Sequence, residues 1–282
     1  MSDYSGSLVV VGDLHTNSDA GLMPPVVYGY KGNPIQQNGF QEWLWDKWLR
    51  MWDFIGEYKV KTKIPLAVVF NGDSVDKNKH APDELISLNE SVILSTAEDV
   101  VRPAVDVADF TYVVRGTPAH TGKGAWLEDQ LGKNIGAVSP NPGAFGDHKQ
   151  HSWWHLYFDI SGVTFDIHHH PESTSMRTWT VGGGALRIAK TVMDEYVLSG
   201  DKPPNVAIRN HNHHWEDSGT NYPTQAFMLP AWQGPTDFIH RKGMGSKVHP
   251  VGCIYFTCYD GKYKWDRLMY EPKRREALEV FA

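Results

Sequence analysis

Five short apolar runs are spread along the chain, and each ends in a turn-forming residue or a polar cluster. They are LVVVGD (8–13), IPLAVVFNGD (64–73), FTYVVRG (110–116), VTFDI (163–167) and PNVAIRN (204–210). Runs of this length that are rich in β-branched residues indicate buried strands. We therefore expect five strands in the first three quarters of the chain.

The stretches between these runs have a helical period. In residues 41–58, Leu44, Trp48, Met51 and Ile55 form one apolar stripe, as on the buried face of a helix. The tryptophans of this segment indicate core packing rather than a cofactor site.

Two further helices are expected. Residues 82–108 predict one that has Pro82 near its start and a kink or break at Pro103. Residues 184–200 predict another, stopped by Gly200. Strands that alternate with helices indicate an α/β fold.

The pattern changes after residue 220. Segments 224–232, 251–260 and 262–270 are strand-like, and Asp260-Gly261 predicts a hairpin turn between the last two. We predict an α/β sandwich of two facing mixed sheets flanked by helices.

Two segments, 16–39 and 132–150, are rich in Gly, Pro and Asn and are expected to be long loops. Loops of this length in a compact domain are usually functional, so both are candidates to cover a site. We find no repeat and no convincing linker, which predicts a single domain over residues 1–282.

The composition is that of an ordinary globular protein, with 41% hydrophobic and 21% charged residues among 282. The start, MSDYSGSLVVVGD, lacks a basic segment followed by an apolar one, so no signal peptide is expected. No apolar stretch approaches the ~18 residues that span a bilayer, so no membrane partner is expected. The net charge of −6 disfavours a broad nucleic-acid-binding face.

Cys253 and Cys258 are the only cysteines. Their spacing places them on opposite faces of a strand, which disfavours a bridge between them. Two reduced, buried thiols in a cytoplasmic protein are expected.

The five predicted strands share one chemical feature, because each is followed by carboxylates, imidazoles or both. In chain order these residues are Asp13 and His15; Asp73 and Asp76; Thr117 and His120; His168, His169 and His170; and His211, His213 and His214. Ligand sites of α/β sheets gather beyond the carboxyl ends of the strands. One such pair would indicate only a solvated turn, but five in register with five strands indicate a site.

Mixed Asp and His without Cys suit Mn²⁺, Fe or Zn²⁺. The chain has no HExxH and no CxxC motif, which leaves the metalloprotease and zinc-finger interpretations without support. In an extended segment, residues i and i+2 point to the same side. Asp13 and His15 are therefore expected to face one site, as are His211 and His213, while His214 points away.

Two carboxylates and about four imidazoles exceed the three protein ligands that one open catalytic metal typically takes. They suit two divalent ions that share a bridging carboxylate. Such ions lower the pKa of bound water from 15.7 toward ~7, which corresponds to about 12 kcal/mol. The motifs thus predict a hydrolase that needs no further general base.

In these motifs the chain resembles the calcineurin-like metallophosphoesterases. That family carries DxH, GDxxD, GNH[DE], a strand-end His and GHxH in this order, and this chain has DLH, GDSVD, GTPAH, HHH and NHNH. The forms GTPAH and DIHHH are most similar to the phage-associated branch. The resemblance covers most of the chain, from residue 12 to residue 213.

The resemblance implies a role for each motif residue. Asp13, His15 and His213 would hold the first metal. Asp73 would bridge, and His169 and His211 would hold the second metal. Asp76 would orient a ligand.

Two departures from the family pattern matter. Thr117 stands where the family has an asparagine ligand, so the second metal would bind loosely or recruit another group. His120 comes three residues after Thr117, whereas the family's catalytic histidine follows directly; the role of leaving-group acid is carried to His120, with a ligand role as the alternative. His168 and His170 stay alternatives to His169.

Three glycines, Gly182–Gly184, precede a predicted helix. A helix start can hold a phosphate, but the segment matches neither phosphate-loop motif and a hinge is the commoner meaning. Arg177 and Arg187 flank it and are candidates to clamp a phosphate, with surface solvation as the alternative. His148, His151 and His155 are expected to be structural or to lie on the surface.

The sequence therefore predicts hydrolysis of a phosphoester. A phosphodiester, with nucleic acid as one candidate, is the first expectation, and a phosphomonoester of a small molecule or protein is the enzyme alternative. A protein that holds one structural metal without turnover is the alternative of another class.

Overall fold

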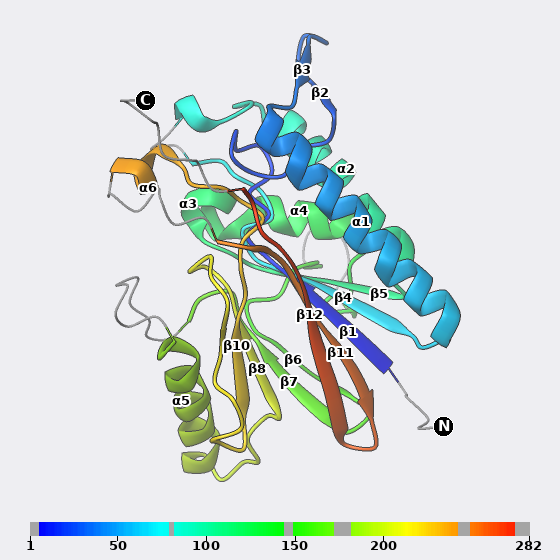
Figure 1. The fold of residues 1–282 in the computed structure, drawn as a ribbon, viewed down its shortest axis with the longest axis vertical. Helices are drawn as coiled ribbons and strands as arrows, with labels where there is room; N and C mark the ends of the chain where they lie inside the picture. Colours follow the sequence, from blue (N-terminus) through cyan, green and yellow to red (C-terminus); the bar gives the residue numbers. More distant parts are fainter. Residues whose placement is uncertain (1–5, 79–81, 144–148, 172–181, 242–248, 274–282) are drawn as a thin grey trace, which may run out of the picture.

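The computed structural model describes residues 6–78, 82–143, 149–171, 182–241 and 249–273. Two five-stranded mixed sheets lie face to face with helices on both outer sides (Figure 1). The architecture is the predicted α/β sandwich.

The first sheet has the order β12-β11-β1-β4-β5. Its strands are β1 (Gly6–Val11), β4 (Leu66–Asn71), β5 (Phe110–Val114), β11 (Val251–Tyr259) and β12 (Lys262–Tyr270). Strands β1, β4 and β5 are parallel, whereas β11 runs antiparallel to β1 and to β12. The three parallel strands therefore end at the same edge.

The second sheet has the order β6-β7-β8-β10-β9. Its strands are β6 (Leu156–Ile160), β7 (Val163–Ile167), β8 (Val206–Arg209), β9 (Glu216–Asp217) and β10 (Gln225–Met228). Strands β7, β8 and β10 are parallel, and the outer two are antiparallel to their neighbours.

The described helices are α1 (Gly39–Thr62), α2 (Glu90–Val107), α3 (Pro118–Thr121), α4 (Trp126–Asn134), α5 (Gly184–Leu198) and α6 (Asp237–Arg241), with single 3₁₀ turns at Pro82–Glu84 and Lys123–Ala125. Helices α1, α2, α4 and α5 cover the outer faces of the sheets. Figure 1 shows α1 and α2 on the side of the first sheet and α5 on the far side of the second.

Successive side chains of a strand point alternately to the helices and to the other sheet, and so form two core layers. Val9 and Val11 of β1 pack with α1, α2 and α4, whereas Leu8 and Val10 pack against the second sheet. Each buried apolar side chain of this size contributes roughly 1.5–3 kcal/mol. The stripe predicted for α1 lies in the outer core, where Trp48 also donates to the carbonyl of Val100 at 2.7 Å.

The second predicted helix begins later than expected. Helix α2 starts at Glu90, because the side chain of Asn89 accepts the backbone amides of Ser91 and Val92, as a helix cap does. Of the kink or break expected at Pro103, the break does not occur, since α2 continues past Pro103 to Val107.

The long-loop predictions were partly wrong. Segment 16–39 contains a small hairpin of β2 (Val26–Tyr28) and β3 (Pro34–Gln36). Segment 132–150 begins inside α4, which ends at Asn134.

The predicted turn between β11 and β12 is confirmed. Tyr259 pairs with Lys262, and Asp260 and Gly261 have φ of 45° and 72°, as a two-residue turn requires. Cys253 faces the helical side and Cys258 faces the second sheet, both as free thiols. Among the described residues, no helix is both long and apolar enough to cross a membrane.

Candidate metal centre

The predicted ligands meet where the parallel strands of both sheets end. Asp13 follows β1, Asp73 follows β4 and Thr117 follows β5, while His169 and His211 follow β7 and β8. The two sheets are tied together at this edge by side-chain amides. The amide of Asn71 donates to Asn210 at 2.7 Å, and that of Asn210 donates to Asp13 at 3.1 Å.

The backbone at these positions is left-handed, not extended as predicted. Asp13, His15, Asp73, His211 and His213 have φ of 51°, 44°, 49°, 72° and 57°. Such values are uncommon outside glycine and cluster at functional sites. The ligand pairs therefore converge through tight turns rather than through the alternation of a strand.

A first group of potential ligand atoms comes from Asp13, His15 and His213. The Nε2 atoms of His15 and His213 lie 3.2 Å apart. They lie 3.9 and 3.5 Å from Oδ1 of Asp13. These are the three residues to which the resemblance gives the first metal.

A second group comes from Asp13, Asp73 and His169, all buried. Nε2 of His169 lies 3.1 Å from Oδ2 of Asp73 and 3.8 Å from Oδ1 of Asp13. The opposite nitrogen, Nδ1, lies 2.8 Å from the carbonyl of Asn71 and donates to it. Asp13 is thus common to both groups, while the bridging role of Asp73 stays a prediction.

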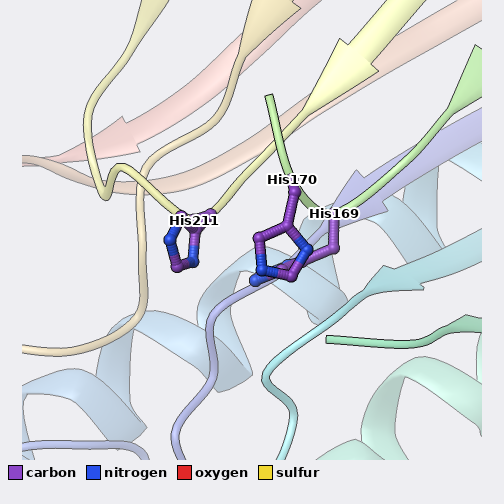
Figure 2. A group of neighbouring side chains, drawn as sticks. All are labelled: His169, His170 and His211. Carbon is purple, nitrogen blue, oxygen red and sulfur yellow. The ribbon is translucent and has the colours of Figure 1, made fainter. Parts of the chain in front are cut away.

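The hydroxyl of Thr117 lies among three imidazoles. Its Oγ1 is 3.5 Å from Nε2 of His169, 3.2 Å from Nε2 of His170 and 3.3 Å from Nδ1 of His211. These histidines form a third group of potential ligands. Figure 2 shows their rings at the ends of β7 and β8.

Two features show that these residues fit divalent cations. Among the described residues, Oδ1 of Asp13 is fully buried without a hydrogen-bond donor, although three imidazoles surround it. Burial would raise the pKa of Asp13 and of Asp73, but the nearby His213 and His169 hold it well below the usual range. Buried ionised carboxylates need a cation.

The protonation of His169 supports the same conclusion. Burial would lower its pKa, but the charges of Asp73 and Asp13 raise it to about 10. Positive charge is therefore strongly favoured between the two carboxylates. A metal ligand must be unprotonated, so a cation bound here would take the place of that proton.

Asp76 links a predicted ligand to the predicted acid. Its Oδ2 lies 3.2 Å from Nδ1 of His15, and its Oδ1 lies 3.0 Å from Nδ1 of His120. Burial lowers the pKa of His120, but the hydrogen bond with Asp76 and the charge of Asp73 raise it to about 9. Without bound cations His120 therefore carries a proton at neutral pH, and the bond at Nδ1 leaves Nε2 as the nitrogen that can deliver it.

Glu128 of α4 supports the site, and the sequence analysis missed it. Its buried carboxylate accepts the amides of Ser74 at 3.0 Å and Gly116 at 2.6 Å, and so joins the turns after β4 and β5. Burial and the charge of Asp73 raise its pKa to about 7. An acidic residue inside an amphipathic helix gives no sequence signal for this role.

The other predicted residues lie apart from these groups. His168 stacks on His155 with ring centroids 4.0 Å apart, and Asp166 lies 3.0 Å from Nε2 of His155 and 2.8 Å from the cation of Arg209. His214 lies 2.9 Å from Glu216 and points away from the site.

A carboxylate already occupies two of the amides at the start of α5. The carboxylate of Glu216 accepts the amides of Gly182 and Ala185, both at 2.8 Å. Arg187 is exposed and bonds to the carbonyl of Gly183, and its predicted role in phosphate binding stays a prediction. Arg177 lies outside the described residues.

Comparisons with known proteins give structural likeness only. No family model matches the sequence, and no curated protein matches it. The fold is similar to a dimetal phosphatase from Danio rerio, with a TM-score of 0.47, 11% identity, and coverage of 95% of this chain and 99% of that chain.

Two further solved structures are similar at a comparable level. Vacuolar Protein Sorting 29 from Cryptosporidium parvum has a TM-score of 0.43 and 12% identity, over 96% of this chain and 100% of that chain. A 5'-nucleotidase from Candida albicans has a TM-score of 0.40 and 8% identity, over 94% of this chain and 51% of that chain. Likeness at this level carries no conclusion about function.

Proposed function

We propose that this protein is a metal-dependent phosphoesterase with two divalent ions at the carboxyl ends of its parallel strands. The observation that carries the proposal is Oδ1 of Asp13, a buried carboxylate oxygen that faces three imidazoles and lacks a donor among the described residues. Asp13, His15 and His213 would hold one ion. Asp73, His169 and His211 would hold the other.

Paired ions, when bound, would supply an activated water and positive charge for the phosphoryl oxygens. Asp76 fixes the tautomers of His15 and His120 by accepting from the Nδ1 of each. His120 then presents Nε2 to the leaving oxygen and gives it a proton. General acid catalysis of this kind contributes typically 10²–10⁴-fold.

A phosphodiester is our first choice of substrate, and the similarity of GTPAH and DIHHH to the phage-associated branch supports it. Single-stranded or short nucleic acids are the candidates, because a net charge of −6 works against long duplexes. A phosphomonoester is the second choice. Mn²⁺, Zn²⁺ and Fe are the candidate ions.

The test is to measure metal content and turnover together. Chelator-treated protein is reloaded with Mn²⁺ or Zn²⁺ and assayed on bis-p-nitrophenyl phosphate and on p-nitrophenyl phosphate. We expect two equivalents of metal and release from the diester that a chelator abolishes. A single tightly held ion with no turnover on either ester would contradict the proposal and favour a structural metal protein.

A further inference from the structure

The surroundings of Thr117 raise the question of which atom completes the second ion site. A hydroxyl has one donor and two acceptor positions, and a neutral hydroxyl is a weaker metal ligand than an imidazole nitrogen. Oγ1 of Thr117 nonetheless has three imidazole nitrogens within 3.5 Å. These nitrogens converge on one region of space. The hydroxyl hydrogen can bond to one of them, and the other two can bond to the hydroxyl only as N–H donors.

The three nitrogens are positioned by separate contacts. His169 is held through Nδ1, which bonds to the carbonyl of Asn71 at 2.8 Å, so Nε2 is the nitrogen that faces the site. The backbone amide of His211 donates to Asp13 at 2.9 Å, and its ring centroid lies 5.3 Å from that of His169. The ring of His170 lies 4.8 Å from that of His169 and 4.6 Å from that of His211, measured between centroids.

The ligand atoms of these histidines all lie within 4.8 Å of one another. Nitrogens bound to one tetrahedral ion at ~2.1 Å would lie roughly 3.4 Å apart, so small ring movements would complete the site. Figure 2 shows the three side chains beside one another, and their ring centroids lie 4.6–5.3 Å apart. Because His170 is exposed, its ring has room to make this movement.

We propose that His170 is a metal ligand, and that His169, His170 and His211 form a three-imidazole site for the second ion. Asp73 closes this site, and Thr117 supports it by hydrogen bonding instead of binding the metal. The inference rests on the proposed two-ion function. The resemblance implies one histidine ligand at the end of β7, whereas this inference assigns two consecutive ones, His169 and His170.

The ligand chemistry has a consequence for metal choice. Imidazole suits Zn²⁺, Cu²⁺, Ni²⁺ and Fe, whereas carboxylate and water suit Mn²⁺. A site with three imidazoles and one carboxylate should therefore select Zn²⁺ or Co²⁺ over Mn²⁺. The first site, in which Asp13 joins only two imidazoles, should discriminate less.

The test is metal binding by full-length protein, independent of turnover. Chelator-stripped wild type, His170→Ala, Thr117→Ala and His168→Ala are titrated with Zn²⁺ and with Co²⁺, whose visible absorption reports nitrogen ligands. His168→Ala is the control, because His168 stacks on His155 and belongs with His155 and Asp166 to a separate group of potential ligands. An unchanged number of bound ions in this variant shows that neither ion is held there. Thermal melting of the stripped variants checks that the fold is intact.

We expect two equivalents in wild type and in His168→Ala. His170→Ala should keep one tight ion and bind the second at least 10-fold more weakly, with loss of part of the Co²⁺ absorption. Thr117→Ala should keep the full Co²⁺ absorption and bind the second ion more tightly than His170→Ala does, since a supporting hydrogen bond and not a ligand is removed.

The outcomes separate this inference from the proposed function. Two tight equivalents in His170→Ala, with loss of the second in Thr117→Ala, would overturn the assignment of His170 and leave the two-ion function standing. A single equivalent in wild type that His170→Ala abolishes would support His170 as a ligand and contradict the two-ion function. A single equivalent that His170→Ala leaves unchanged would contradict both.

Discussion

Replacement of Gly72 by alanine should displace His169 and weaken the metal centre. Gly72 has φ of 78°, and a Cβ built on it would lie 2.2 Å from Nδ1 and 2.7 Å from Cβ of His169. A contact this short requires the ring to move away from the carbonyl of Asn71. Alanine in a left-handed conformation costs about 1–2 kcal/mol, and overpacking adds about 1–3 kcal/mol.

Gly32 offers a matched control. Its φ is 79°, and nothing lies within 4 Å of a Cβ built there. Gly32→Ala therefore bears the same backbone cost without the contact. The difference in unfolding free energy between the two variants isolates the cost of the contact with His169. We expect Gly72→Ala to be less stable than Gly32→Ala by about 1–3 kcal/mol.

The assay combines urea unfolding of the metal-free proteins with titration of each by Zn²⁺. We expect Gly72→Ala to bind the second ion about 10–100-fold more weakly, the loss typical when a group that orients a metal ligand is disturbed. Gly32→Ala should bind metal as wild type does. Equal unfolding free energies and equal metal affinities in the two variants would refute the placement of His169 beside Gly72.

Two other predictions concern a helix cap and the proton donor. Glu216 accepts the amides that begin α5, and although burial would raise its pKa, the bonds with His214 and with Gly182 lower it to about 2. Because the folded pKa is depressed, this stabilisation is full above about pH 4.5 and is lost as the pH falls toward 2. Urea unfolding should therefore show Glu216→Gln to be less stable than wild type by on the order of 2 kcal/mol at pH 6. This difference in unfolding free energy should close by pH 2. A difference that does not depend on pH would contradict the role given to the Glu216 charge. His120→Ala should keep its metal content but lose about 10²–10⁴-fold in turnover of esters with poor leaving groups. It should lose much less with a nitrophenolate leaving group, and equal losses for both would argue against an acid role.

The sequence was sufficient to predict the layers and the location of the centre. Apolar runs closed by polar residues identified β1, β4, β5, β7 and β8, and the parallel order of these strands brings their ends together. The convergence of Asp13, Asp73 and His169 follows from this topology. The apolar runs of the sequence coincide with the strands because these strands are buried between a layer of helices and the other sheet.

Other features depend on contacts between distant segments, which no local pattern reports. Glu128 is one acidic residue of an amphipathic helix until α4 packs beneath the turns after β4 and β5. Asn71 and Asn210 read as ordinary strand-end residues, although their amides join the two sheets. The position of His170 among the imidazoles likewise depends on the turns that follow β7 and β8.

The start of α2 shows a different limit. Pro82 suggested the first turn of a helix, but the capping side chain of Asn89 fixes the start of α2 at Glu90, eight residues later. The apolar periodicity of 82–108 does not distinguish these two starts, whereas the hydrogen bonds of the cap do.

The most direct test of the two-ion phosphoesterase compares metal-loaded wild type with Asp73→Asn, which keeps the shape of the side chain and removes its charge. Asp194→Asn, on the exposed side of α5, is the control. We predict that Asp73→Asn folds as wild type does, binds fewer than two ions and loses phosphoester hydrolysis. Hydrolysis by Asp73→Asn at the wild-type rate would contradict the account.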